Sequence, residues 1–498
     1  MAYTIVRGGR VLDIAAGTAD HADILIEDDT IRELRPPDLM PPAAATEIDA
    51  TNRLIHPGLV NAHTHSHGNL GKGMGDRWPL ELLLTAAPML TGYRGLDDLR
   101  LSAQIGAVEM MLKGCTACYD LFFEWPVPTR DGMAAVASAY AELGLRAVIA
   151  PMVADRTFFE AIPGLAEALP PILRERVQAL RLAPRDETLG AIRGGFGAWS
   201  IDRDLVRPAV APTIPHHCSD EFILGCAGIA RDFDVGLHSH VAESKVQAVA
   251  SLKVYGRTQT AHLDALGVLG PHFTVAHGVW LDPDDMTRLG DHGASVAHNP
   301  GSNMRIGSGL ADTRTMLERH VNLGIGTDGA TCADNQNMYE AMRLASFVSK
   351  VQGPEWQRWL TTREAALAAT EGSARALGFG DRIGRIAPGW KADLVLLDLD
   401  HPNWLPLNDP VNQLVHAEDG NAVDSVMIGG RLVVRNRKPV GIDLAKLRQR
   451  AEAARERLHA ANADNRKLYA ALEPVVGSFC PGLARMAYHV HRYGARVE

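Results

Sequence analysis

From residue 59 to about residue 378 the chain repeats one unit: a short apolar run, a polar segment at its end, and an amphipathic helical stretch. Eight apolar runs follow this pattern, at residues 59–62, 116–120, 145–150, 205–211, 235–240, 273–277, 294–298 and 322–328. Strands that alternate with helices pair in parallel, because each helix carries the chain back to the same end of the sheet. The pattern therefore predicts an α/β fold, a (β/α)8 TIM barrel.

The two ends of the chain do not show this alternation of strand and helix. Residues 1–58 and 379–441 contain short alternating strands separated by Gly, Asp and Pro, and we expect them to form one composite β-sandwich domain beside the barrel of residues 59–378. Residues 442–498 are predicted to be a helical extension and a tail. The helical part is charged and rich in Ala, and the tail from Pro481 has no interpretable pattern, so surface or subunit packing is its default role.

Composition excludes several classes of function. The formal net charge is −9, which argues against a nucleic-acid partner because no basic surplus exists to neutralise phosphates. No apolar run approaches the length that crosses a membrane, and the N-terminus lacks the apolar core of a signal peptide, so we expect a cytoplasmic protein. Of the six cysteines, Cys115 and Cys118 have the spacing of a redox or metal pair, but buried thiols in a reducing compartment are the favoured interpretation.

Histidines and one aspartate stand at the ends of the predicted barrel strands. Residues two apart on a strand point to the same side, and the carboxyl ends of barrel strands converge on one face. A single histidine at such a place is more often a packed core residue than a metal ligand. Several at one level favour a metal site, because buried imidazoles and carboxylates are costly unless they are paired or bound to metal. The candidates are His63, His65, His238, His240, His277, His298 and Asp328.

Five motifs resemble those of the metal-dependent amidohydrolase superfamily. They are His63-Thr-His65, His240-Val-Ala-Glu243, Ala276-His277-Gly-Val-Trp280, His298-Asn-Pro-Gly-Ser-Asn303 and Gly326-Thr-Asp328-Gly. The most similar branch contains triazine hydrolases, methylthioadenosine/S-adenosylhomocysteine deaminases, and guanine and cytosine deaminases. The resemblance extends over nearly the whole chain to about residue 441.

This resemblance implies one catalytic divalent metal ion per chain, with Zn²⁺ as the first choice and Fe²⁺ or Mn²⁺ as alternatives. By position in the motifs, its ligands are His63, His65, His240 and Asp328. Three imidazoles and one carboxylate leave a coordination position for water, as a catalytic site requires. His238 is the rival of His240 on the same face of the strand, and we rank it as barrel filling.

The same resemblance implies the catalytic residues Glu243, His277 and Asp328. A bound divalent cation lowers the pKa of water toward about 7 and so supplies hydroxide at neutral pH. Asp328 can accept the proton of that water, and His277 matches the residue that orients the hydroxide and polarises the attacked centre. Glu243 would carry the proton to a ring nitrogen and then to the leaving group, which is general acid/base work.

Four residues are predicted to bind substrate: Trp78, Thr213, His216 and Asn303. Deaminases of the adenosine type in this branch tend to have His where this chain has Thr213, which weakens a purine-nucleoside assignment. Trp78 either stacks on a planar ring or covers the barrel rim, and His216 either contacts substrate or belongs to a solvated loop. Asn303 either lines the site or holds the loop after the seventh strand.

The predicted function is the hydrolytic removal of an amino group, or of another leaving group, from a small nitrogen heterocycle. The alternative is an amidohydrolase that cleaves an open amide, urea or carbamate C–N bond, because both reactions use hydroxide attack and a protonated leaving nitrogen. The third hypothesis is a non-catalytic metal-binding protein. Such a protein is expected to have lost a catalytic acid or a metal ligand, and the presence of Glu243, His277 and Asp328 speaks against it. The expected partners are the heterocyclic substrate and further copies of the chain in a homo-oligomer, with no nucleic acid and no membrane.

Overall fold

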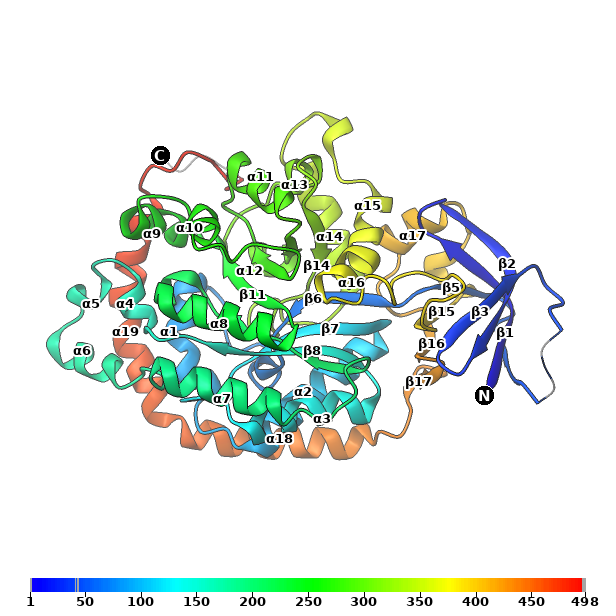
Figure 1. Ribbon diagram of the computed structural model, residues 1–498, viewed down its shortest axis with the longest axis horizontal. Helices are drawn as coiled ribbons and strands as arrows, with labels where there is room; N and C mark the ends of the chain where they lie inside the picture. The colour runs from blue at the N-terminus through cyan, green and yellow to red at the C-terminus, as the bar shows by residue number, and fades with distance from the viewer. Residues whose placement is uncertain (1, 41, 43, 495–498) are drawn as a thin grey trace.

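The computed structural model describes residues 2–40, 42 and 44–494. It contains a central barrel, a β domain on one side of the barrel and a C-terminal helical extension that runs along the barrel and then up its opposite side (Figure 1).

Parallel strands form the barrel. They are β6 (Leu59–Thr64), β7 (Cys115–Phe122), β8 (Arg146–Val153), β9 (Val206–Pro208), β10 (Ala211–Pro212), β11 (Leu237–Val241), β12 (Phe273–His277), β13 (Ser295–His298) and β14 (Asn322–Ile325). β6 to β10 pair in one sheet and β11 to β14 in a second, and a bridge between Val210 and Leu237 joins the two. The barrel closes where the Asp328 N–H donates a hydrogen bond to the carbonyl of His63 at 2.9 Å.

The fourth barrel strand is split into β9 and β10. Pro208 and Pro212 lie at the ends of these two pieces, and proline has no N–H to donate to a neighbouring strand. Counted as one position, this pair gives eight strands around the barrel. The predicted (β/α)8 barrel is confirmed, as is the flanking β domain built from both chain ends.

Helices surround the barrel strands. They are α1 (Leu80–Thr91), α2 (Leu96–Leu112), α3 (Arg130–Leu143), α8 (Asp220–Phe233), α9 (Lys245–Tyr255), α10 (Gln259–Ala265), α11 (Pro283–Asp291), α12 (Pro300–Arg305), α13 (Thr313–Glu318), α14 (Met338–Lys350), α15 (Thr362–Leu367), η4 (Ala368–Gly372) and α16 (Ser373–Ala376). Short 3-10 turns are η1 (Ser66–Gly71), η2 (Pro215–His217), η3 (Trp356–Arg358) and η5 (Pro402–Trp404). Ser219 caps α8, because its side chain accepts a hydrogen bond from the Phe222 N–H.

A helical insertion lies between β8 and β9. It consists of α4 (Phe158–Ala161), α5 (Leu165–Ala168), α6 (Pro171–Gln178) and α7 (Arg185–Gly197). α4 and α5 have four residues each, too few to carry a periodic signal in the sequence.

The flanking domain is one nine-stranded sheet made from both chain ends. Its strands are β1 (Tyr3–Asp13), β2 (Thr18–Glu27), β3 (Thr30–Arg35), β4 (Thr46–Asp49), β5 (Arg53–Pro57), β15 (Leu394–Asp398), β16 (Val423–Ile428), β17 (Arg431–Arg435) and β18 (Lys438–Pro439). β5 pairs antiparallel with β15, which joins the two ends, and α17 (Pro410–His416) packs nearby. Arg146 at the start of β8 makes a buried two-bond ion pair with Asp393, at 2.8 and 3.1 Å, and so ties the barrel to this sheet.

The C-terminal extension begins with α18 (Leu444–Ala461), which contacts α2, and continues as α19 (Ala463–Ala484), which contacts α1 and α9. α19 continues through Pro474 and Pro481, so it includes the start of the tail for which the sequence has no interpretable pattern. Its buried face, with Leu468, Leu472 and Val476, packs into an apolar cluster that includes residues of α1 and α9. That burial favours helix where the prolines oppose it.

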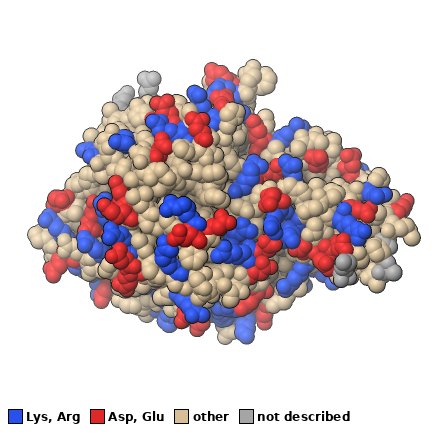
Figure 2. All heavy atoms as spheres, viewed as in Figure 1, with Lys and Arg blue, Asp and Glu red and all other residues tan. Residues whose placement is uncertain are grey.

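Charged side chains of both signs are interspersed over the face seen in Figure 2, and that face shows no continuous basic surface. Among the described residues, none of the helices combines the length and the apolar character that crossing a membrane requires.

Candidate active site

Four side chains from three places in the barrel converge at the carboxyl ends of its strands. His63 lies in β6 and His65 directly after it, His240 lies in β11, and Asp328 follows β14. The Asp328 Oδ1 atom is 3.5 Å from His63 Nε2 and 3.2 Å from His65 Nε2. His240 Nε2 lies 3.2 Å from His65 Nε2. Two overlapping groups, His63 with His65 and His240, and His63 with His277 and Asp328, bring their candidate ligand atoms within 4.8 Å of one another.

Main-chain carbonyls set the direction in which two of these imidazoles face. The Nδ1–H of His65 donates to the carbonyl of Leu121 at 2.7 Å, and the Nδ1–H of His240 donates to the carbonyl of Thr213 at 2.6 Å. A neutral imidazole that donates from Nδ1 carries its lone pair on Nε2. Two lone pairs therefore face each other at 3.2 Å beside a carboxylate, an arrangement that a bound cation satisfies.

His63 supports the same conclusion, because it is fully buried and neither of its ring nitrogens has a hydrogen-bond partner among the described residues. Burial lowers the pKa of His63 to about 3, so the ring is neutral at physiological pH. Neutral imidazole is the form that binds metal. The donor set fits a divalent cation.

The electrostatics of the cluster depend on Asp328. Burial alone would raise the pKa of this carboxyl, but His63 and His65 outweigh burial and hold the pKa well below its usual range. In return, Asp328 outweighs the burial of His65 and raises the pKa of that imidazole. Asp328 therefore stays ionised beside the imidazoles, and an ionised carboxylate next to histidines is a donor set that binds a divalent cation.

His277 and Glu243 lie beside the cluster. The Nδ1–H of His277, at the end of β12, donates to Asn303 Oδ1 at 2.8 Å. Its Nε2 atom lies 3.6 Å from Glu243 Oε1 and 3.7 Å from Asp328 Oδ2. Both His277 and Asp328 have positive φ angles, +71° and +63°, a conformation that is strained for residues with a Cβ and needs support from its surroundings.

Glu243 follows β11 and is 2% exposed. Burial, with Asp328 and Glu81 as nearby negative groups, raises the pKa of Glu243 well above its usual range. Its main-chain N–H donates to Gln247 Oε1 at 2.9 Å, which holds the start of the following helix close to the site. The buried carboxyl therefore favours its protonated form at a place where it faces His277.

The predicted substrate-binding residues differ in how they relate to the cluster. Asn303 bonds to His277, and Thr213 contributes its carbonyl to His240 while its hydroxyl lies 3.7 Å from the Met152 sulfur. The bonds from His277 to Asn303 and from His240 to Thr213 join two of the predicted residues directly to histidines of the site.

Trp78 and His216 are held by outer elements instead. The ring of Trp78 is 5.5 Å from Tyr469 of α19, and His216 accepts at Nδ1 from Gln259 and stacks on Tyr255. Among the described residues, these two side chains form no hydrogen bond or ring stack with the metal-site histidines, and their role in substrate binding stays a prediction.

His238 and His298, the other strand-end histidines, are fully buried. The centre of the His238 ring lies 4.4 Å from that of Tyr119 and 5.0 Å from that of His63. His238 belongs to neither group of candidate metal ligands.

The structure contains a polar network around Asp328 that the sequence did not predict. Gln336 Nε2 donates to the Asp328 carbonyl at 3.0 Å, and Asn61 Nδ2 donates to Thr327 Oγ1 at 2.7 Å. These bonds hold the strained turn that carries Asp328. Asn61 lies on a predicted strand, but Gln336 lies in a loop without a pattern, so no sequence signal marks this network.

Comparison with known proteins gives a consistent result. The amidohydrolase family matches residues 54–433 of the chain. A 5'-deoxyadenosine deaminase of Methanothermobacter thermautotrophicus is 33% identical over 455 residues, which cover 90% of this chain and 97% of the relative. A zinc-bound adenosine deaminase from Xanthomonas campestris has a TM-score of 0.81 at 26% identity, covering 92% of this chain and 99% of its own. Atrazine chlorohydrolase from Arthrobacter aurescens, in complex with zinc, has a TM-score of 0.79 at 26% identity, with coverages of 91% and 100%.

Proposed function

The chain belongs to the amidohydrolase family, and from this premise we propose that it uses a divalent metal ion to remove an amino group from a small nitrogen heterocycle. It is a hydrolase of non-peptide C–N bonds. One observation carries the proposal: a buried Glu243 carboxyl and the Asp328 carboxylate both face His277 Nε2, at 3.6 and 3.7 Å, beside a cluster of inward-facing imidazoles.

We assign the metal to His63, His65, His240 and Asp328, with zinc as the ion. The inward lone pairs of His65 and His240 and the unpartnered ring of His63 support this assignment, as do the zinc-containing structures of similar proteins. When bound, a divalent cation supplies a water of lowered pKa and a positive charge next to the attacked carbon.

The residues of the chain then have distinct tasks. Asp328, whose pKa is low, accepts the proton of the attacking water. His277 is neutral because burial lowers its pKa, and Asn303 fixes its ring so that Nε2 faces the reacting atoms.

Glu243 has the opposite electrostatic character to Asp328. Its raised pKa lets it hold a proton at neutral pH and deliver that proton to a ring nitrogen and then to the departing amine. Two carboxyl groups whose pKa values are pushed apart are the pattern expected of an acid and a base that act on one substrate.

The substrate class follows from what similar proteins share. The names of the relatives include a 5'-deoxyadenosine deaminase and a methylthioadenosine/S-adenosylhomocysteine deaminase, and those of the structures include adenosine deaminase and atrazine chlorohydrolase. Adenine and triazine rings both carry the leaving group on a carbon next to a ring nitrogen. By its resemblance to this branch, the chain has Thr213 where adenosine-type deaminases tend to have His, which weakens a purine-nucleoside assignment.

The second candidate function is displacement of another leaving group, such as chloride, from the same kind of ring, and the likeness to atrazine chlorohydrolase favours it. Cleavage of an open amide, urea or carbamate uses the same acid and base and remains the runner-up. A non-catalytic metal-binding role does not explain why Glu243 and His277 are both present and face each other. The homo-oligomer and the cytoplasmic location expected from the sequence stay predictions.

The test is a substrate panel run on purified protein of measured metal content. We expect ammonia release from at least one aminated pyrimidine, purine, pterin or triazine, and loss of that release when a chelator removes the metal. Chlorinated triazines with chloride detection, and open-chain ureas and amides, form the other two arms. Turnover of open-chain compounds alone would replace the proposal with the runner-up, and a protein that binds no divalent metal would refute it.

A further inference from the structure

The C-terminal segment Tyr488–Tyr493, called here the strap, contacts two loops that follow barrel strands. The Arg492 side chain donates to the carbonyl of Leu281 at 2.8 Å and pairs with Asp312 at 3.3 Å. The Arg492 carbonyl accepts from the Leu310 N–H at 2.8 Å. Leu281 belongs to the loop after β12, and Leu310 and Asp312 belong to the segment between α12 and α13, so one residue of the strap holds both.

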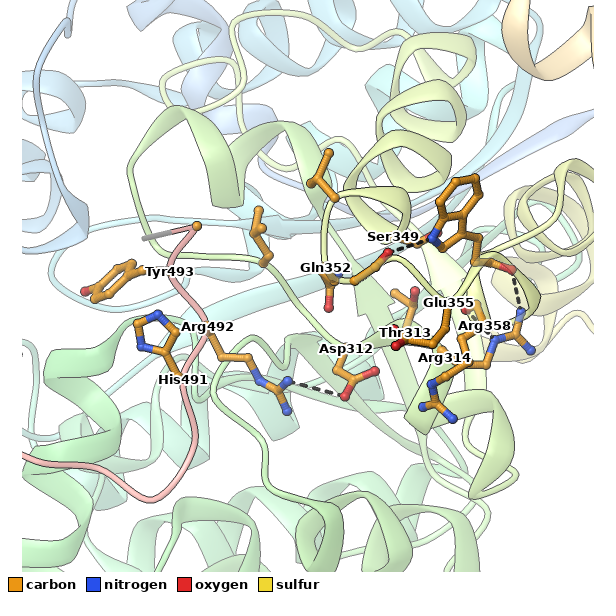
Figure 3. A pocket seen from close by; sticks show the side chains of 15 residues that line it. Asp312, Thr313, Arg314, Ser349, Gln352, Glu355, Arg358, His491, Arg492 and Tyr493 are labelled. Atoms are coloured by element: carbon orange, nitrogen blue, oxygen red, sulfur yellow. Dashed lines mark hydrogen bonds and ion pairs between the residues drawn. The ribbon is translucent and has the colours of Figure 1, made fainter. Parts of the chain in front are cut away.

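Figure 3 shows how this contact is built. The Arg492 side chain points from the strap toward Asp312, on one side of a cavity of about 320 Å³ that Thr313 and Gln352 also line. The Arg492 side chain is only 11% exposed. Asp312 also caps α13 by accepting from the Thr315 N–H at 3.1 Å, so Arg492 acts on the start of that helix.

The strap approaches the second loop closely at Gly309. This residue has a φ of +123°, and a Cβ placed there would lie 2.8 Å from the Arg492 carbonyl oxygen. Glycine is therefore required for the main chains to come this close.

Aromatic packing strengthens the contact at the loop after β12. Trp280 is fully buried, and its ring lies 5.0 Å from Tyr493 and 6.1 Å from Tyr488. The Trp280 Nε1–H donates to the Ser308 carbonyl at 2.8 Å, which joins this loop to the segment after α12. At the other end of the strap, His489 pairs with Asp282 at 2.7 Å.

A short chain of hydrogen bonds leads from these loops to the active site. The Ser308 N–H donates to the Asn303 carbonyl at 2.8 Å, and Asn303 Oδ1 accepts from His277 Nδ1–H at 2.8 Å. His277 has a φ of +71°, a strained conformation that needs support from its surroundings. The strap contacts both the loop that follows His277 and the segment that follows Asn303.

We propose that the strap is a positioning element of the active site, in which Arg492 and the packing on Trp280 hold the two loops so that Asn303 orients the His277 imidazole. This proposal rests on the catalytic role proposed for His277. The metal ligands lie in or just after β6, β11 and β14. The strap bonds instead to the loop after β12 and to the segment between α12 and α13, so it acts on His277 and leaves metal binding unchanged. Loss of orientation should lower kcat by on the order of tenfold to a hundredfold with a smaller change in KM.

The test compares Arg492→Ala with His491→Ala, its exposed neighbour in the strap, which serves as the matched control. A second pair is a chain that ends at residue 487, which lacks the strap, and one that ends at residue 494, which keeps it. Three quantities are measured: metal content, hydrogen exchange of the segment 303–312, and kcat and KM on a substrate from the panel. Methylguanidine added to the Arg492→Ala variant should restore part of the lost kcat.

We expect Arg492→Ala and the chain ending at residue 487 to keep their metal, to exchange faster in 303–312 and to lose kcat, while both controls match wild type. Unchanged exchange in 303–312, unchanged kcat, or loss of metal together with kcat would each overturn the proposal. If wild type turns over no compound of the panel, the proposed function fails, whereas hydrogen exchange, which needs no substrate, still decides whether the strap holds these loops.

Discussion

Replacing Glu243 with glutamine is the most direct perturbation of the proposed chemistry. The carboxyl is buried, and burial, with Asp328 and Glu81 nearby, raises its pKa well above its usual range, which favours the protonated form that the proposed mechanism needs. An amide has nearly the same shape and also donates a hydrogen bond, but it cannot give up a proton and take it back. The variant should therefore fold normally and keep its metal, because Glu243 is not among the proposed ligands.

The expected loss follows from the task of the group. A positioned general acid/base contributes about 100- to 10,000-fold to a rate, or roughly 3–5 kcal/mol of activation free energy. Glu243 is the buried carboxyl that faces His277 and is not proposed to bind the metal, so we expect a loss toward the upper end of that range. KM should change little, because the contact made by the acid is strongest in the transition state.

The assay is ammonia release under saturating substrate, with metal content measured on the same sample. Glu221→Gln, on the exposed first turn of α8, is the charge-matched control and should behave as wild type. A variant at Glu243 that retains kcat within a factor of about three, well inside the range expected for a lost acid, would remove this residue from the mechanism. A variant that loses its metal would mean that Glu243 acts as a ligand.

Two further predictions concern the metal and the pH dependence of stability. His240→Ala should lower metal occupancy, whereas His238→Ala should leave occupancy near that of wild type; elemental analysis of both decides, and the reverse order would exchange their roles. Burial raises the pKa of Asp285 to about 6, so the folded state holds this proton at a pH where the unfolded chain has lost it. Folding stability should fall as pH rises from about 4 to above 6, by about 3 kcal/mol from this group. Asp285→Asn should flatten that fall in urea unfolding, and an unchanged slope would contradict the assignment.

Local geometry explains why much of the active site was predictable. His63 and His65 face one side because side chains alternate along a strand, and parallel strands bring their carboxyl ends to one face of the barrel. These two rules need only the sequence spacing, and they brought His240, His277 and Asp328 into the candidate set. The choice between His238 and His240 was different, because both lie on the same side of β11. The structure packs His238 against Tyr119 and sets His240 3.2 Å from His65.

The contacts made by the loops and by the C-terminal segment could not be predicted from the spacing of residues along the sequence. From the sequence, Trp78 and His216 are expected near the barrel rim. In the structure their rings pack on Tyr469 and Tyr255, and the periodicity of the sequence does not reveal these partners. In the helical insertion between β8 and β9, α4 and α5 have only four residues each, which is too short to show amphipathic spacing. The Leu121 and Thr213 carbonyls that orient the imidazoles are main-chain groups, which every residue type provides.

The amino-acid sequence by itself determined the barrel, the β domain built from both ends and the set of strand-end residues from which a metal site can be made, because these depend on the short periods of strands and helices. Only the tertiary structure decided which ring nitrogens face one another, which carboxyl keeps its proton, and that the strap lies on the loops beside His277. Those properties depend on burial and on contacts between residues hundreds of positions apart, and such contacts exist only after the chain has packed.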